Sequence, residues 1–374
     1  MKKIYSLLSI LFVSTSFFAQ QTNKTIDING VTRTYVEYIP VGYNPVTEKV
    51  PLIIVMHGLG DNGANMALAG FNQIADTARF IVLYPDGVPT TTFAGTFTSW
   101  NNGTLLASTA DDIGLMSALM EYEVTNNNIN ESRIYATGFS MGSIMSYHLA
   151  CEMNDRIAAI ACMSGTMSSS DIANCVATYK TPVLHMHGTA DGTVPYNGGL
   201  PSLSSVAQTI NFWQAANGCD LVPDSMYMPN LGTDNYITNR FIYQNCDGSS
   251  ALEFWRIDSA GHEYMLQPVN DYSAPKEAWH FFYQHSNPAA TQVGITENNL
   301  ATSSIYPNPA TDIVHLDYSQ ELDRMYVLNM SGKLVYFSNK QDKSISVNTW
   351  EKGVYFVTLE MKNGEKTTKK LVVE

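Results

Sequence analysis

The chain has 374 residues, which is long for one domain and short for three, so one large domain with a small module is expected. Its hydrophobic fraction of 45% is that of a globular protein with a sizeable core. The formal net charge of -13 argues against a nonspecific nucleic-acid binder and against attraction to an anionic membrane, because both need a basic surface.

The first residues have the pattern of a secretory signal peptide. Lys2 and Lys3 precede an apolar run over residues 4–18, which is short for a membrane span, and the small residue Ala19 follows it. An N-terminal anchor helix is the alternative. Residues 1–19 are therefore predicted to be removed on export. No later apolar run is long enough to cross a bilayer, so we expect no membrane span in the mature protein.

Residues 24–285 alternate short apolar runs with amphipathic ones, which is the pattern of an α/β domain. Continuous apolar runs between turn residues predict strands that are buried on both faces, as in a parallel sheet. The predicted strands are residues 50–56, 80–84, 133–137, 157–163, 182–186 and 252–257. Helical spacing predicts helices over residues 112–124, 143–153 and 275–285, with Asp112 as an N-cap.

The texture of the sequence changes after residue 285. Residues 286–304 are rich in Asn, Pro, Ala, Thr and Ser without a sustained period, which predicts a linker. Residues 305–374 give short alternating runs separated by turn pairs, which predicts a small all-β sandwich. Its predicted strands are residues 313–317, 325–328, 333–337, 344–347, 354–359 and 369–373.

Five cysteines in an exported chain favour disulfides. Cys162 lies inside an apolar run and is expected to be a free, buried thiol. The other four cysteines allow three pairings. We favour Cys219 with Cys246, because both lie at loop-like ends, and Cys151 with Cys175 then follows by elimination.

Residues 138–142, Gly-Phe-Ser-Met-Gly, match the pattern G-x-S-x-G. The motif directly follows a predicted strand and precedes a helical pattern, which is the context of a nucleophile elbow. Glycines on either side leave room for the tight turn, and the helix N-terminus behind it favours developing negative charge. Ser140 is therefore the candidate nucleophile.

A nucleophilic serine needs a base, and the base needs an orienting carboxylate. Asp191 and His262 each lie just past a predicted strand, so both fall at the edge of the sheet where Ser140 lies. Of the eight histidines, His262 alone combines a position after the acid with a strand-end loop. Asp258 and Glu263 compete for the acid, but they lie too close to His262 in sequence.

An oxyanion hole needs two backbone N–H groups. Met141, after the nucleophile, supplies one, and the His-Gly-Leu-Gly loop after the first core strand supplies the other through Leu59. His57 in that loop has either a role in the site or none. Trp100, in a strand-end loop, is a candidate substrate-binding residue or a core anchor. No zinc, EF-hand, P-loop or dinucleotide motif occurs, so neither a metal nor a cofactor is expected.

Residues 50–262 resemble the secreted polyhydroxybutyrate depolymerase-like and feruloyl esterases near carbohydrate esterase family 1. The matching segments are residues 57–60, 100–101, 111–114, 138–142, 184–191, 194–196, 217–219 and 261–262. The resemblance implies the α/β-hydrolase fold, with Ser140 as nucleophile, Asp191 as acid and His262 as base. Family members often carry a tryptophan shortly after that histidine, where this chain has Glu-Tyr-Met-Leu, and this leaves the substrate open.

The last 70 residues resemble a type IX secretion sorting domain. Residues 305–312, Ile-Tyr-Pro-Asn-Pro-Ala-Thr-Asp, open it, and residues 353–356 and 369–373 carry its late motifs. The resemblance implies export by the type IX machinery as a partner, and a secreted or cell-surface location. A carbohydrate-binding sandwich is the alternative.

The leading hypothesis is a secreted serine carboxylic-ester hydrolase. It would remove feruloyl or acetyl groups from plant polysaccharides through an acyl-enzyme. A polyester depolymerase is the first alternative, and a non-catalytic surface binding protein is the second. The expected partners are an ester-bearing polysaccharide or polyester and the secretion machinery.

Overall fold

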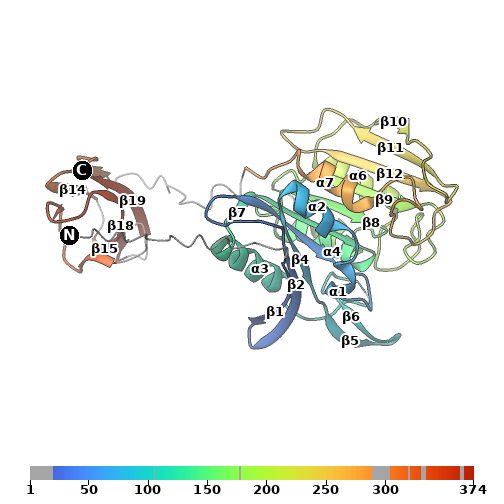
Figure 1. The fold of residues 1–374 in the computed structure, drawn as a ribbon, viewed down its shortest axis with the longest axis horizontal. Helices are drawn as coiled ribbons and strands as arrows, with labels where there is room; N and C mark the ends of the chain where they lie inside the picture. The colour runs from blue at the N-terminus through green and yellow to red at the C-terminus, as the bar shows by residue number, and fades with distance from the viewer. Residues whose placement is uncertain are drawn as a thin grey trace, which may run out of the picture. The chain divides into compact units, whose positions relative to one another are not determined.

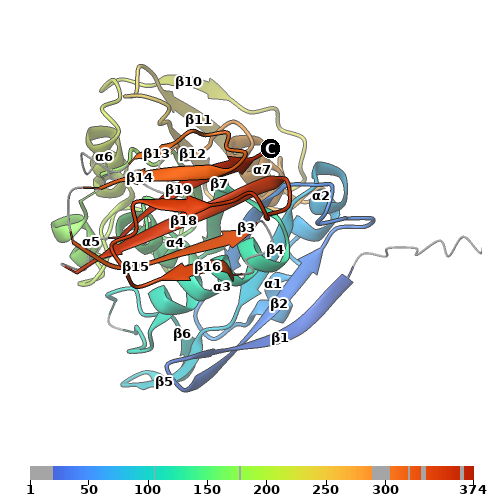
Figure 2. The same ribbon diagram turned by 90° about the vertical axis from the view of Figure 1, so that its left-hand side faces the viewer.

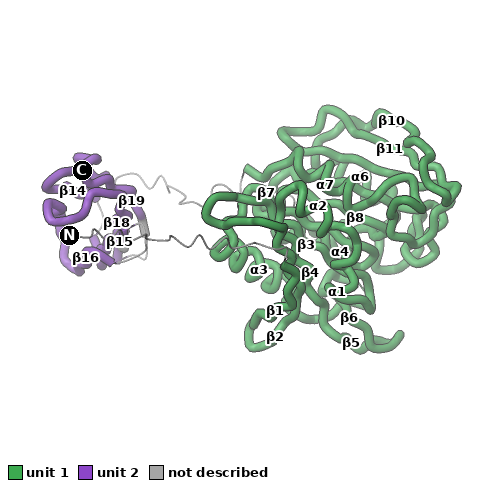
Figure 3. Tube along the Cα trace, viewed as in Figure 1, with its two compact units in different colours: residues 1–291 green, residues 292–374 purple. Residues whose placement is uncertain are grey.

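The computed structural model describes residues 20–104, 106–176, 178–288, 304–318, 321–329, 334–362 and 366–374. The chain divides into two compact units, Met1–Thr291 and Gln292–Glu374 (Figure 3). The predicted signal peptide and most of the predicted linker lie outside the described residues. Within these ranges, no helix is both long and apolar enough to cross a bilayer.

A ten-stranded sheet in the order β1-β2-β4-β3-β7-β8-β9-β12-β11-β10 forms the centre of the larger unit (Figure 1). Neighbours from β4 to β12 in this order run parallel, and the outer strands on both sides are antiparallel. The strands are β1 (Gln20–Ile28), β2 (Val31–Ile39), β3 (Val50–Met56), β4 (Ile81–Pro85), β7 (Ile129–Phe139), β8 (Ala159–Met163), β9 (Val183–Gly188), β10 (Asp224–Tyr227), β11 (Ile237–Tyr243) and β12 (Leu252–Asp258).

Helices cover both faces of this sheet. They are α1 (Gly63–Met66), α2 (Phe71–Ala78), α3 (Asp112–Asn126), α4 (Met141–Glu152), α5 (Ser169–Asn174), α6 (Val206–Ala216) and α7 (Ala274–Phe282). Successive side chains of β3 enter different cores: Leu52 and Ile54 pack with α3, α4 and α6, whereas Ile53 packs with α2 and α7. A strand whose neighbouring residues point to opposite covered faces must be apolar throughout, which explains the continuous run.

A separate hairpin of β5 (Val88–Thr92) and β6 (Gly95–Ser99) extends away from the central sheet (Figures 1 and 2). Neither this hairpin nor β10 and β11 was predicted from the sequence. The predicted domain starts at residue 24, but β1 and β2 were not predicted as strands. β1 and β2 lie on one outer side of the central sheet, and β11 and β10 lie on the other. The edge strands β1 and β10 carry exposed polar residues, so they lack the apolar run that marks a buried strand.

The predicted central strands all occur. The helix over residues 112–124 is also found, but its predicted N-cap is wrong by one residue. Asp111 is the cap, and its carboxylate accepts a hydrogen bond of 2.8 Å from the Gly114 N–H. The carboxylate of Asp112 is buried instead against Arg33, at 2.6 Å.

The smaller unit contains two antiparallel sheets around a core of its own (Figure 2). The strands are β13 (Ser304–Tyr306), β14 (Ile313–Asp317), β15 (Leu322–Asn329), β16 (Leu334–Ser338), β17 (Ser344–Ser346), β18 (Gly353–Met361) and β19 (Lys366–Val373). Val314 from one sheet and Val357 from the other are both fully buried in this core. The predicted small all-β fold is confirmed.

The two predicted disulfides are present. Cys151 is bonded to Cys175, and Cys219 to Cys246. Cys162 is the buried free thiol, and burial raises its pKa.

A buried carboxylic acid lies between α3 and the first two strands. Glu123 is fully buried near the carboxylate of Glu37, which forms an ion pair of 2.5 Å with Lys24. The Asn127 amide donates a hydrogen bond of 2.6 Å to Glu123. Burial and the negative charge of Glu37 raise the pKa of Glu123 to about 8, so this carboxyl holds its proton at neutral pH.

This raised pKa predicts a loss of stability at alkaline pH. The native state binds the Glu123 proton more tightly than the unfolded chain does. The contribution of this proton to the free energy of unfolding is therefore complete below about pH 4.5, and it is lost as the pH rises through about 8. The loss should be on the order of a few kcal/mol. Glu123→Gln should flatten this part of the profile of unfolding free energy against pH. The exposed Glu121→Gln, on the same helix, should retain the wild-type profile, and an identical slope in both variants would contradict the assignment.

Candidate active site

Ser140 lies on a sharp turn between β7 and α4. Its backbone angles, φ 56° and ψ -119°, fall in a region that residues other than glycine rarely adopt. Its N–H donates to the Met163 carbonyl at 2.9 Å. A Cβ added to Gly142 would lie 2.1 Å from the Met56 carbonyl oxygen, so only glycine fits where α4 starts against β3. The G-x-S-x-G spacing thus follows from close backbone contacts.

Asp191 and His262 meet at the carboxyl edge of the sheet. The Nδ1 atom of His262, after β12, is hydrogen-bonded to Oδ2 of Asp191, after β9, at 2.8 Å. The N–H groups of Thr193 and Val194 each donate to Oδ1 of Asp191 at 2.8 Å. Burial by itself would raise the pKa of Asp191, but hydrogen bonds from His187, His262 and Val194 outweigh it and hold the pKa well below its usual value. The carboxylate is therefore ionised at physiological pH.

His187 is a second histidine on the same carboxylate. Its Nε2 atom lies 3.4 Å from Oδ2 of Asp191 and donates to the Val194 carbonyl at 2.9 Å. The side chain is fully buried, whereas that of His262 is 18% exposed. His187 precedes Asp191 in the sequence, so it does not have the position expected of the base. The i, i+4 spacing to Asp191 was the available signal for this supporting contact.

His262 lies next to the turn that carries Ser140. The ring of Phe139, which directly precedes Ser140, lies 4.8 Å from the His262 ring between centroids. The three residues predicted from their order in the sequence therefore come from neighbouring loops of one sheet edge.

An apolar cavity of about 240 Å³ opens beside Ser140. Its walls combine residues from six separate segments of the chain, and most of these residues are aliphatic or aromatic. They include Leu59, Phe93, Met141, Ile144, Val194 and Leu203. Phe93 is the exposed tip of the β5–β6 hairpin, with 87% of its surface accessible.

The predicted oxyanion residues Leu59 and Met141 both line this cavity next to Ser140. Trp100 does not. Its side chain is fully buried, and its indole N–H donates to the His57 carbonyl at 2.9 Å. The structure therefore places Trp100 under the loop that carries Leu59 rather than in the wall of the cavity.

Two segments of the chain match known protein families. Residues 42–211 match the family Phospholipase/Carboxylesterase, and residues 304–374 match the secretion system C-terminal sorting domain. The probable feruloyl esterase C of Aspergillus terreus is 30% identical over 270 residues, which are 70% of this chain and 87% of that protein. The chain belongs to the feruloyl esterase family.

Two further proteins are similar to this esterase. Feruloyl esterase C of Emericella nidulans is 29% identical over 269 residues, covering 70% of this chain and 87% of that protein. An acetyl xylan esterase from Aspergillus awamori has a similar structure, with a TM-score of 0.49 and 15% identity, over 71% of this chain and 99% of that chain.

The predicted class and fold are confirmed: the protein is a carboxylic ester hydrolase of the α/β-hydrolase fold. Its C-terminal sorting domain makes it an extracellular or cell-surface enzyme, as predicted.

The backbone of Ser140 predicts a stability difference between two small replacements. Glycine adopts a positive φ without steric cost, whereas alanine keeps the Cβ that causes the strain. Ser140→Gly should therefore exceed Ser140→Ala by about 1 kcal/mol in free energy of unfolding, measured by urea titration. Equal stability of the two variants would show that the turn is not strained.

Proposed function

We propose that this esterase removes aromatic acyl groups of the feruloyl type from plant polysaccharides. The observation that carries the proposal is the apolar cavity beside Ser140. A polysaccharide is covered with hydroxyl groups, so the apolar walls suit the acyl side of the ester rather than the sugar side. The relatives at about 30% identity are named feruloyl esterases, which supports the same acyl class.

The proposed mechanism is acyl transfer through Ser140. Since Nδ1 of His262 is bound to Asp191, its Nε2 atom is available to take the Ser140 proton as the hydroxyl attacks the ester carbonyl. The ionised Asp191 stabilises the imidazolium that forms. The Leu59 and Met141 N–H groups would bind the oxyanion of the tetrahedral intermediate.

His262 then returns the proton to the departing sugar oxygen, and the acyl group remains on Ser140. In the second half, His262 takes a proton from water, which attacks the acyl-enzyme. The second tetrahedral intermediate then collapses, His262 returns its proton to Oγ of Ser140, and the carboxylic acid is released. The fully buried His187 would keep the Asp191 carboxylate oriented through both halves.

The size and apolar character of the cavity also bear on the two other ester classes, acetyl esters and aliphatic polyesters. An acetyl group has a single methyl and would leave most of an apolar space of about 240 Å³ empty, which forgoes the contacts that this space offers. An aliphatic polyester unit would meet the same apolar walls, so a polyester depolymerase remains the second candidate. The names of the relatives favour the aromatic ester over it.

We further propose that residues 24–285 and 305–374 fold as separate domains joined by residues 286–304. Each unit has a hydrophobic core of its own, which supports this division. Every residue proposed for catalysis belongs to the first domain. The second would engage the type IX secretion machinery.

The nucleophile assignment predicts the effect of one substitution. Ser140→Ala should reduce kcat for methyl ferulate by about a thousand-fold or more, because removal of a triad member typically has this effect. Circular dichroism of the purified variant would check that its fold is intact. Retention of most of the wild-type rate in a folded variant would rule out Ser140 as the nucleophile.

The acyl-pocket assignment predicts a change of selectivity. Leu203→Trp should fill the cavity and lower kcat/KM for methyl ferulate by about 10-fold or more, because even one methylene in a tight pocket shifts discrimination by this order. p-Nitrophenyl acetate, whose acyl group is small, should react at close to the wild-type rate. Leu231→Trp, the same change at an exposed position away from the cavity, is the matched control. A parallel loss on both esters would argue against an acyl pocket.

A further inference from the structure

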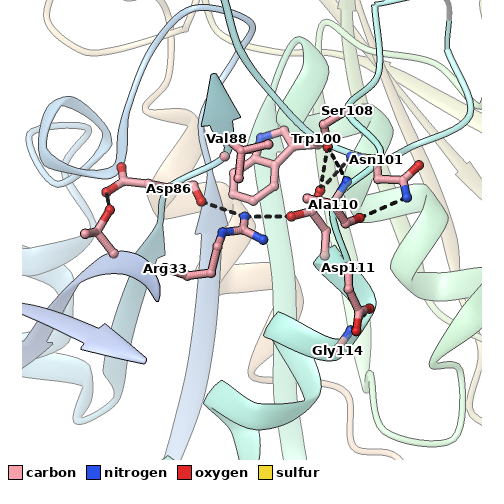
Figure 4. Close-up of polar contacts among 12 residues, drawn as sticks. Arg33, Asp86, Val88, Trp100, Asn101, Ser108, Ala110, Asp111 and Gly114 are labelled. Carbon is pink, nitrogen blue, oxygen red and sulfur yellow. Dashed lines mark hydrogen bonds and ion pairs between the residues drawn. The ribbon is translucent and has the colours of Figure 1, made fainter. Parts of the chain in front are cut away.

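A buried ion pair lies behind the loop that carries Leu59. Arg33 of β2 and Asp112 of α3 are 4% and 1% exposed, and their side chains meet at 2.6 Å. Figure 4 shows the Arg33 guanidinium between Asp86 and the segment that holds Trp100, Asn101 and Asp111. An ion pair buried this deeply is costly to desolvate and is weak evidence for stability by itself, so its contacts need another account.

The same Arg33 nitrogen that binds Asp112 also donates to the Asp86 carbonyl oxygen at 2.9 Å. That carbonyl shares its peptide unit with the Gly87 N–H, and the two groups of a trans peptide point in opposite directions. The Gly87 N–H donates to Nε2 of His57 at 2.9 Å. Arg33 thus holds the peptide that holds one side of the His57 ring.

The other ring nitrogen of His57, Nδ1, extends this series of hydrogen bonds. Its Nδ1–H donates to the Gly58 carbonyl at 2.6 Å, while Nε2 accepts, which is the bonding of a neutral imidazole. Burial lowers the pKa of His57, which favours this neutral form. The Gly58 carbonyl shares its peptide with the Leu59 N–H, so fixing the carbonyl aims that N–H in the opposite direction.

In this series, each hydrogen bond has its donor on the Arg33 side and its acceptor on the Leu59 side. We propose that Arg33 is a positioning residue for the oxyanion hole. It acts through the Asp86–Gly87 peptide, the His57 ring and the Gly58–Leu59 peptide to orient and polarise the second oxyanion donor. Chains of hydrogen bonds aligned in this way strengthen one another in a buried setting.

Asp112 holds the other side of this arrangement. Its Oδ2 accepts the Asn101 N–H at 2.6 Å, next to Trp100, whose indole N–H donates to the His57 carbonyl at 2.9 Å. The Trp100 and His57 rings lie 4.8 Å apart between centroids. The ion pair therefore fixes both segments that contact His57, which accounts for a buried charge pair at this point.

The inference rests on the proposed acyl-transfer mechanism, since it assigns the orientation of one oxyanion donor. The test must separate this role from simple stabilisation. The double variant Arg33→Met/Asp112→Asn leaves no unpaired buried charge, and its Asn can still accept the Asn101 N–H, so the fold should survive. The matched control is Arg240→Met/Glu253→Gln, which removes an ion pair between β11 and β12 remote from His57.

The measurement is kcat per titrated active site on p-nitrophenyl acetate, well below the unfolding temperature. The Arg33/Asp112 variant should lose about 10-fold or more in kcat with KM unchanged, because an oxyanion donor acts on the transition state. The control should keep its kcat even if its Tm falls. A lower Tm with wild-type kcat per site in the Arg33/Asp112 variant would overturn the proposal.

A double-mutant cycle with His57→Phe tests the route. If Arg33 acts through His57, adding Arg33→Met/Asp112→Asn to His57→Phe should lower kcat no further than His57→Phe does alone. Multiplicative losses would mean that Arg33 acts by another path, and the proposal would fail. Ser140→Ala serves as the reference for the mechanism itself: activity in that variant would refute the proposed function, whereas its loss together with an unaffected Arg33/Asp112 variant would refute only the positioning role.

Discussion

The close contact between the start of α4 and the end of β3 is the constraint on which the site depends. A Cβ at Gly142 would collide with the Met56 carbonyl, and this contact leaves Ser140 at a positive φ between strand and helix. The turn places both Ser140 and Met141 in the wall of the cavity. A Cβ added to Gly58, in the loop after β3, would lie 3.4 Å from the Cβ of Ser140, so this loop runs close to the turn. A strained backbone is kept here because both neighbouring elements are fixed by a sheet that is buried on both faces.

Three buried sites in the described part of the chain show what a buried charge requires. Asp191 accepts two backbone N–H groups and contacts two histidines, so a carboxylate with little access to water remains ionised. Arg33 and Asp112 satisfy one another and two backbone groups besides. Glu123 has less compensation and keeps its proton instead. The three cases follow one rule, in which the number of donors or opposite charges decides between ionisation and neutrality.

The cavity beside Ser140 is assembled from segments with no common local pattern. Leu59 follows β3, Phe93 tips a hairpin, Ile144 lies on α4 and Leu203 precedes α6. They form one apolar surface only in the folded protein, where they meet beside Ser140. This is why the motifs of the chain could define an ester hydrolase while its acyl preference had to be argued from the structure.

The sequence by itself determined the order of the central strands along the chain, the elbow at Ser140, and the positions of Asp191 and His262 after their strands. These features are local: a run of apolar residues, a pair of glycines or a loop at a strand end is complete within a few positions. Only the tertiary structure decided that His187 contacts Asp191, that Trp100 is buried under the loop that carries Leu59, and that Asp112 pairs with Arg33 rather than capping its helix. The last contact joins residues 79 positions apart, and β2, which carries Arg33 between β1 and β4, lacks the continuous apolar run by which a buried strand is predicted. Such contacts depend on how the strands are ordered in the sheet, which local periodicity does not encode.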